Sequence, residues 1–233
     1  MLKIRCSAIG NIMTNARSKN EILSKTTKSY LQELAIENYF GRRKYFTSKY
    51  TEKGNEVEEE SIRLCEEVLQ KGFLYKNEEK LENDYIKGIP DVNTSNVLID
   101  VKSSWDIFSF PHFDKKLNNK AYYYQLMGYM WLTGKSSAYL CYCLVNTPQN
   151  KIEDEIRREH WKQFEIDENP EIRAHVEKLH LYNDIDNNLK VKLFKIEYDE
   201  KVIESIKNRI DECRVYYDEL INELNLKLIV DAE

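Results

Sequence analysis

Two carboxylates and a lysine stand at a spacing that suits chemistry in the segment GIPDVNTSNVLIDVKSS. Side chains of a β-strand alternate between its two faces, so Asp100 and Lys102 share one face of the apolar run VLIDVKS. A half-buried strand normally turns single charges toward water, whereas this one places a carboxylate beside an ammonium. Asp91 lies just before the turn that leads into the strand and adds a second carboxylate. These three side chains are therefore candidates for one charged site.

Two carboxylates held together away from water repel each other, and one takes up a proton unless a cation is present. Mg²⁺ prefers hard oxygen ligands and keeps several waters, so it would relieve this repulsion, and Mn²⁺ would substitute for it. The sequence therefore predicts a magnesium site with Asp91, Asp100 and the main-chain carbonyl of Val101 as ligands. Lys102 would lie beside the metal-bound water and orient or deprotonate it for attack on phosphorus. An ion pair between Asp100 and Lys102 on one strand face is the alternative interpretation.

The segments around this strand predict the helices and strands that must hold the site. TTKSYLQELAIENYFG has apolar residues at helical spacing, with Thr26 or Thr27 to cap its start and Gly41 at its end. RCSAIGNIMT is expected to be a short helix or a loop, and the polar residues 150–180 are ambiguous. The other expected helices span 54–70, 118–134 and 199–225, and the expected strands span 73–77, 84–89, 97–103, 137–146 and 189–199.

The order of these elements over residues 54–147 predicts an α/β core with a mixed sheet. A chain of 233 residues with 42% hydrophobic content and no linker rich in Pro, Gly or Ser is expected to form one domain, residues 1–233. Its longest apolar run is far short of the ~20 residues of a membrane span, and it lacks a signal-peptide layout, so a cytoplasmic protein is expected. Five cysteines without a CxxC pair argue against a disulfide framework, and Cys141 and Cys143 are expected to be reduced thiols on one strand face.

The charged segment resembles the signature of the PD-(D/E)XK nuclease superfamily, with Pro90-Asp91 as its first half and Asp100-Val101-Lys102 as its second. Two more segments follow the superfamily's order. GNEVEEES is similar to the G-x-x-x-E helix of the phage exonuclease and RecB-like branches, and this similarity implies Glu58 as an extra acidic ligand. QLMGY matches the Q-x-x-x-Y motif of the same branches at Gln125 and Tyr129, which the resemblance implies are catalytic contacts.

The resemblance is strongest to the phage-type alkaline exonucleases, the lambda-exonuclease or YqaJ-like branch, over residues 54–129. It implies a restriction-endonuclease-like core, a mixed central β-sheet flanked by helices, with extra N- and C-terminal helices. It also implies a Mg²⁺-dependent DNA exonuclease that hydrolyses phosphodiester bonds at duplex ends in phage-type recombination or DNA processing. Related exonucleases form ring-like assemblies and work beside a single-strand annealing protein. The resemblance therefore implies a homo-oligomer and such a partner. A nicking or restriction-like endonuclease and a catalytically idle DNA-binding or scaffold module remain the alternatives.

Candidate DNA contacts lie outside the charged strand face. CSAIGNIM is similar to the N-terminal segment of that branch, in which a serine touches the phosphate of the DNA end, and Ser7 is the matching position. The arginine that clamps the 5′ phosphate there has no counterpart, because Arg5 lies at a different spacing. The net charge is −5, but basic residues concentrate near the N-terminus, which suits a phosphate-bearing substrate or simply a solvated surface. The assigned DNA contacts are Ser7, Ser103, Ser104, Arg42, Arg43 and Lys44.

Each of these motif residues also has a structural interpretation. Glu58 is by itself a charge at the margin of an amphipathic helix. Gln125 and Tyr129 share a helix face and would also serve packing beside the neighbouring tyrosines. The basic run after Gly41 would also interact favourably with the negative end of the helix dipole at the C-terminus of the preceding helix. The ordered set of motifs favours the site interpretation.

Overall fold

The computed structural model of the chain describes residues 1–45, 47–70, 72–164 and 167–226. Its main sheet has four strands in the order β4-β5-β6-β7, and a smaller sheet has the order β1-β3-β2. Strand β5 runs parallel to β6, whereas the pairs β4–β5 and β6–β7 are antiparallel, so the sheet is mixed as predicted. The strands are β1 (Ile4–Arg5), β2 (Leu81–Glu82), β3 (Ile86–Gly88), β4 (Val92–Asn93), β5 (Leu98–Ser103), β6 (Ser137–Cys143) and β7 (Val191–Glu197).

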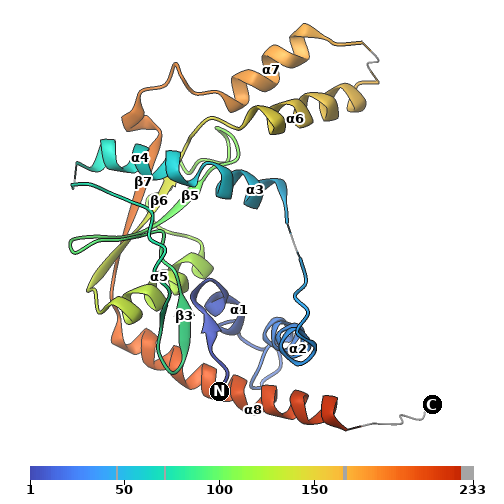
Figure 1. The fold of residues 1–233 in the computed structure, drawn as a ribbon, viewed down its shortest axis with the longest axis vertical. Coiled ribbons are helices and arrows are strands. Elements are labelled where there is room, and N and C mark those ends of the chain that lie inside the picture. The colour runs from blue at the N-terminus through green and yellow to red at the C-terminus, as the bar shows by residue number, and fades with distance from the viewer. Residues whose placement is uncertain (46, 71, 165–166, 227–233) are drawn as a thin grey trace.

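Helices cover both faces of the main sheet (Figure 1). Helix α4 (Glu58–Leu69) packs on one face, while α5 (Lys120–Thr133) and α8 (Glu200–Asn225) close the other. No described helix is long and apolar enough to cross a membrane. The remaining helices are η1 (Cys6–Ala8), α1 (Ile9–Ile12), α2 (Lys25–Phe40), α3 (Lys49–Glu56), α6 (Gln149–Lys162), α7 (Pro170–His180) and η2 (Asn187–Leu189).

The ends of the long helices follow from single polar or glycine residues. Helix α2 begins after Ser24, whose hydroxyl accepts a hydrogen bond from the Thr27 amide at 3.0 Å, so the cap lies two residues before Thr26. It ends as predicted at Gly41, which adopts the left-handed conformation with a φ of 63°. Gly134 ends α5 in the same way with a φ of 69°. These ends fix where the helical side chains meet the sheet.

Two expected elements around the site differ from the structure. The predicted helix 54–70 is two helices, because the backbone of Val57 leaves the helical conformation while its side chain is buried in the core. The segment 73–77 is not a strand. Its Leu74 amide donates to the Glu66 carboxylate at 2.6 Å and its Asn77 amide to the Asp91 carbonyl at 2.8 Å, so its backbone groups are satisfied without a strand ladder.

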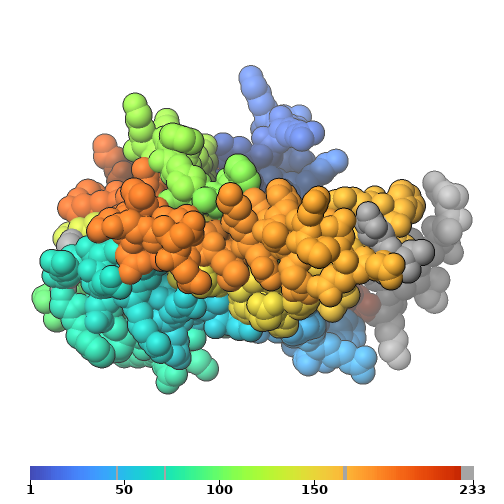
Figure 2. Space-filling view, turned by 90° about the horizontal axis from the view of Figure 1, so that it is seen from above, coloured from blue at the N-terminus to red at the C-terminus, as the bar shows by residue number. Residues whose placement is uncertain are grey.

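The ambiguous segment 150–180 contains the helices α6 and α7. Four buried aliphatic residues from the two helices form their common core, which is separate from the core of the sheet. Figure 2 shows α6 and α7, in yellow and orange, covering much of one face of the molecule. Charged residues dominate the rest of α6 and hide its apolar stripe in the sequence. The four core residues are Ile152, Ile156, Ile172 and Val176.

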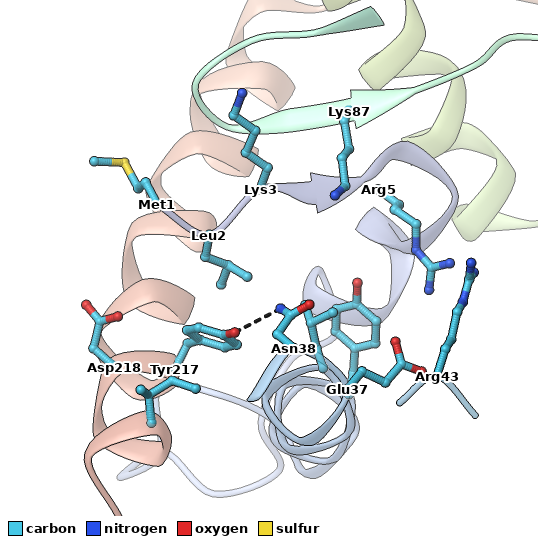
Figure 3. A pocket seen from close by; sticks show the side chains of 13 residues that line it. Met1, Leu2, Lys3, Arg5, Glu37, Asn38, Arg43, Lys87, Tyr217 and Asp218 are labelled. Atoms are coloured by element: carbon cyan, nitrogen blue, oxygen red, sulfur yellow. Dashed lines mark hydrogen bonds between the residues drawn. The ribbon is translucent and has the colours of Figure 1, made fainter. Parts of the chain in front are cut away.

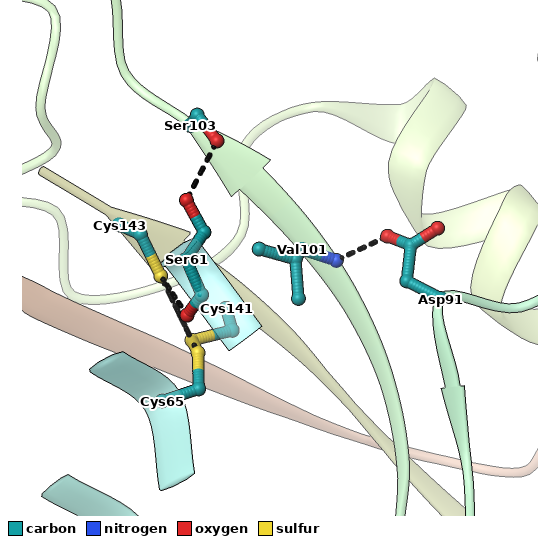
Figure 4. Close-up of a disulfide and its surroundings, with 7 residues drawn as sticks. All are labelled: Ser61, Cys65, Asp91, Val101, Ser103, Cys141 and Cys143. Atoms are coloured by element: carbon teal, nitrogen blue, oxygen red, sulfur yellow. Dashed lines mark hydrogen bonds between the residues drawn. A yellow bond between two sulfur atoms is a disulfide. The ribbon is translucent and has the colours of Figure 1, made fainter. Parts of the chain in front are cut away.

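The cysteine prediction is wrong for Cys141, which forms a disulfide with Cys65 (Figure 4). Cys141 and Cys143 do share one face of β6 as expected, and both are fully buried. Helix α4 crosses that face and brings Cys65 over them, 76 positions earlier in the chain. Cys143 remains a free thiol with its Sγ 3.3 Å from Cys65 Sγ. Sequence spacing did not predict this meeting because it depends on helix packing.

Candidate active site

The site begins where β4 ends and one edge of β5 is left open. Strand β4 pairs with β5 only through Val92 and Asn93. Beyond this pairing, the Val101 amide donates to Asp91 Oδ2 at 2.6 Å, as Figure 4 shows. The amide and carbonyl of one strand residue point to the same edge, so the Val101 carbonyl lies on the side of Asp91. The structure therefore brings Asp91 to the open edge of the strand that carries Asp100.

Asp100 is buried, with 1% of its surface exposed, and is held from the α5 side. Its Oδ1 accepts a hydrogen bond from Gln125 Nε2 at 2.8 Å, and the same nitrogen donates to the Tyr129 hydroxyl at 3.1 Å. Gln125 thus contacts a site carboxylate, while Tyr129 contacts Gln125 and is itself buried. The Q-x-x-x-Y pair fixes the orientation of Asp100 from inside the fold.

Lys102 forms the ion pair that the alternative interpretation expected. Its Nζ lies 2.6 Å from Asp100 Oδ2, and it also lies 5.0 Å from the ring centre of Tyr122. The Oδ2 atom is buried, and the Lys102 ammonium is the polar partner that it meets there. Both predicted side chains therefore occupy the same face, with one carboxylate oxygen only partly satisfied.

Glu58 is the first residue of α4 and reaches the same cleft as Asp91 and Lys102. Its Oε2 lies 2.7 Å from Lys76 Nζ, an ion pair that the sequence did not suggest. The oxygens of Glu58, Asp91 and Asp100 do not all lie within 4.8 Å of one another, so a side chain would have to turn for the three to hold one cation. Among the described residues, only the trio Cys65, Cys141 and Cys143 brings its ligand atoms that close, but Cys65 and Cys141 are joined in a disulfide and therefore do not offer thiolates to a metal.

The charges of the site perturb one another. Burial raises the pKa of Asp91 to about 7, and repulsion from Asp100 adds to this shift. Burial also raises the pKa of Asp100, against the attraction of Lys102. For Lys102, burial lowers the pKa, but the Asp100 and Asp91 carboxylates outweigh it and the net pKa is raised. Without a cation, the lysine is therefore an ammonium, and both aspartates bind a proton more readily than a free carboxyl group does.

The residues fit a hard divalent cation on these observations. Three carboxylates and a main-chain carbonyl supply only oxygen donors, which is the ligand set that Mg²⁺ prefers. Burial and mutual repulsion disfavour the ionised carboxylates, and a cation between them would remove that cost. Asp100 Oδ2 also keeps unused acceptor capacity. The ligands that fit are Glu58, Asp91, Asp100 and the Val101 carbonyl.

The assigned DNA contacts divide between two places. Ser103 and Ser104 line a cleft of about 480 Å³ together with Glu58, Asp91 and Lys102. Ser7, Arg43 and Lys44 line a second hollow of about 450 Å³, which also contains Arg5. Figure 3 shows Arg5 and Arg43 close together in the adjoining pocket of about 600 Å³. Arg42 is exposed and does not contribute to the lining of either pocket.

Sequence reasoning missed Lys53, which is only 1% exposed. Its Nζ donates to the carbonyls of Ser104 at 2.7 Å and Trp105 at 2.9 Å, so it ties α3 to the loop that follows β5. Burial lowers the pKa of this ammonium to about 8. A lysine in a polar helix gives no signal of such a contact, because the two carbonyls lie about fifty positions further along the chain.

Comparison with known proteins relates the whole chain to two solved structures. A crystal structure of a phage-related exonuclease from Haemophilus somnus 129PT matches with a TM-score of 0.79 and 32% identity, covering 96% of each chain. An alkaline exonuclease from Laribacter hongkongensis matches with a TM-score of 0.64 and 14% identity, over 96% of this chain and 91% of that one, and supports the fold alone. Its complex with dAMP gives a TM-score of 0.63. No family model and no curated protein matches the sequence.

Proposed function

The chain belongs to the phage-related exonucleases, a branch of the PD-(D/E)XK nucleases, and on that premise we propose that it is a Mg²⁺-dependent DNA exonuclease. Its proposed reaction is hydrolysis of phosphodiester bonds at duplex DNA ends, with Mn²⁺ able to replace Mg²⁺. The observation that carries the proposal is the open edge of β5. There Asp91, Asp100 and Lys102 meet, with Asp91 fixed by the Val101 amide.

The chain's own residues have separate tasks in this proposal. Glu58, Asp91, Asp100 and the Val101 carbonyl hold the cation, and Gln125 keeps the Asp100 carboxylate in place. A bound Mg²⁺ would lower the pKa of a coordinated water and neutralise charge that develops on the phosphoryl oxygens. Lys102 would orient the attacking water. To accept a proton from that water it must first release its own proton to solvent, and a cation that drew the carboxylate charge away would favour this release by lowering the lysine pKa. A bound cation would compete with the Lys76 ammonium for the Glu58 carboxylate.

The test is release of acid-soluble nucleotides from linear duplex DNA, with magnesium and with chelator. We expect activity that chelator abolishes and that magnesium or manganese restores. Covalently closed circular DNA of the same sequence is the matched control and should resist hydrolysis. Equal rates on closed circles would replace this proposal with a nicking or restriction-like endonuclease, and activity indifferent to chelator would remove the metal.

The single-strand annealing partner, the homo-oligomer, the single-domain organisation and the cytoplasmic location stay predictions from the sequence. The idle-scaffold alternative predicts that Asp100→Asn and Lys102→Ala bind and process DNA as the parent does. These two variants therefore distinguish the idle-scaffold alternative from the proposed enzyme, for which both substitutions should reduce hydrolysis.

A further inference from the structure

Two walls face each other across the cleft that contains the charged site. Helix α3 and the start of α4 form one wall, which includes Glu58. The end of β5 and the loop after it form the other wall, which includes Val101 and Lys102. The proposed ligands are divided between these walls, because Glu58 comes from the first and Asp100 from the strand of the second. A cation shared by both ligands therefore requires a defined spacing between the walls.

The side chain of Lys53 connects the first wall to the second. Lys53 lies in the last turn of α3 and is 1% exposed. Its Nζ donates to the carbonyls of Ser104 at 2.7 Å and Trp105 at 2.9 Å. The pairing of β5 with β6 extends only as far as Ser103, so Lys53 holds the chain at the point where the strand ladder ends.

The main chain of Lys53 belongs to the turn that leads to Glu58. Its carbonyl accepts a hydrogen bond from the Val57 amide at 3.0 Å, and Glu58 is the next residue. One residue therefore contacts both the segment that positions Glu58 and the loop that follows β5. A shift of this residue would change the spacing between the two walls.

The charge of Lys53 is unusual for a residue that only fills the core. A lysine is almost never fully buried unless it is paired, and an ammonium away from water is costly. Among the described residues, no carboxylate forms an ion pair with Lys53, and Asp106 and Glu60 act on it only from a distance. Its pKa of about 8 keeps it mostly protonated at neutral pH, so both hydrogen bonds are charge-assisted. This costly group is placed where it fixes the cleft.

We propose that Lys53 is a positioning residue that sets the spacing between the two walls, so that Glu58 can turn to a cation held by Asp91 and Asp100. This inference rests on the proposed nuclease function and names the residue that brings the third carboxylate to the site. Lys53 touches neither the cation nor the substrate. It acts through α3 on one side and through the loop after β5 on the other.

The first test is calorimetric titration of Mn²⁺ into Lys53→Met, which keeps the length of the side chain and removes both hydrogen bonds. Affinity should fall by about 10–100-fold, the usual loss when a group that orients a metal ligand is removed. Lys151→Met is the matched control. Lys151 is 8% exposed, and its Nζ pairs with Glu52 of the same helix α3 at 2.8 Å. Its loss should change the affinity by less than about threefold.

A double-mutant cycle with Glu58→Gln separates positioning from a general effect on the fold. In the Glu58→Gln background, Lys53→Met should lower Mn²⁺ affinity by less than about threefold, because the ligand that it positions has already been removed. An equal loss in both backgrounds would overturn the proposal, since Lys53 would then act on the site without Glu58.

Hydrogen exchange of the amides of residues 104–109 tests the hold on the loop without metal or hydrolysis. Exchange should be about 10–100-fold faster in Lys53→Met than in the parent, as expected for the loss of charge-assisted hydrogen bonds, and unchanged in Lys151→Met. Lys53→Gln, which keeps an amide donor, should give smaller changes in both measurements and serves if Lys53→Met does not fold. Unchanged exchange would overturn the role of Lys53. A parent that binds no Mn²⁺ would instead overturn the proposed function, and the exchange result would still decide whether Lys53 holds the loop.

Discussion

The two faces of β5 are built by alternate residues of one short strand, yet they differ in chemistry. Asp100 and Lys102 face α5, where Asp100 meets Gln125 and the Asp91 and Asp100 carboxylates have raised pKa values. Ile99 and Val101 face α4, inside an apolar cluster that also includes Cys143. One face holds an ion pair beside a second carboxylate that repels the first, while the other face buries apolar surface. The difference indicates that neighbouring residues of the same strand carry the proposed catalytic role and the stability of the fold.

This separation has a physical reason. A buried ion pair gains little stability because desolvation offsets most of the Coulomb attraction. Burying an aliphatic side chain, by contrast, contributes about 1.5–3 kcal/mol. The apolar face therefore stabilises a strand whose charged face adds little stability of its own, and the proposed cation would relieve the repulsion on that face. Substitutions on the two faces should then affect different measurements.

The largest effect is expected for Lys102→Ala. Loss of the group that handles the proton should lower kcat by about 10²–10⁴-fold. Metal affinity should persist or increase, because a positive charge beside the cation has been removed. Calorimetric titration of Mn²⁺ or Mg²⁺, paired with the nuclease assay, measures both quantities.

Lys195→Ala is the matched control for that change. Lys195 lies on β7 and pairs with Glu197 two residues later at 2.6 Å, the same spacing as Asp100 and Lys102, but 52% of its side chain is exposed. Its loss should leave kcat unchanged. If Lys102→Ala loses the metal together with the activity, Lys102 holds the carboxylates structurally and is not the proton-transfer group.

Ile99→Ala tests the opposite face. Ile99 is fully buried, so its truncation should lower the free energy of unfolding by about 2–4 kcal/mol. The kcat of the folded molecules should remain close to that of the parent. Urea denaturation and activity per folded protein provide the two measurements. Ile22→Ala, at a position that is 69% exposed, should cost less than 0.5 kcal/mol, and a large loss of kcat in Ile99→Ala would show that the two faces are not separate.

Much of this division was predictable from local pattern. Period-two alternation identified the face of Asp100 and Lys102, and the turn before the strand placed Asp91 at its edge. Gly41 and Gly134 ended their helices as expected. These features depend on residues close in sequence, so a single chain carries enough information for them.

The features that were missed depend on packing between distant segments. Lys53 meets carbonyls about fifty residues away, and Cys65 meets Cys141 across the helix–sheet interface. Lys76 reaches Glu58 from a segment that was expected to be a strand. No local period encodes such contacts.

Gln125→Ala should have a smaller effect than either face substitution. It removes the hydrogen bond to Asp100 Oδ1, and loss of a residue that orients a ligand typically costs 10–100-fold in metal affinity or activity. Tyr129→Phe is the control, because its hydroxyl contacts Gln125 rather than a carboxylate oxygen. Both variants are compared by metal titration and by nuclease rate. Equal losses in the two would mean that the whole Q-x-x-x-Y pair acts as one unit.

The smallest expected effect is the pH dependence of the charged face. Burial and repulsion from Asp100 raise the pKa of Asp91 to about 7, from about 3.9 in an unfolded chain. The folded, metal-free protein therefore binds more protons than the unfolded chain between these values. The stability that Asp91 contributes is present below about pH 4 and is lost as the pH rises through about 7.

Metal binding must have the opposite dependence, because cation and proton compete for the same carboxylate. Magnesium affinity should fall by up to about tenfold per pH unit below pH 7 and level off above it, since one proton is displaced per cation. Titrations at pH 6, 7 and 8 measure the slope. Asp91→Asn should bind more weakly and lose the dependence, while Ile99→Ala should keep it unchanged. An affinity that is flat from pH 6 to 8 would show that Asp91 is ionised without the metal, and the charged face would then be less costly than its burial implies.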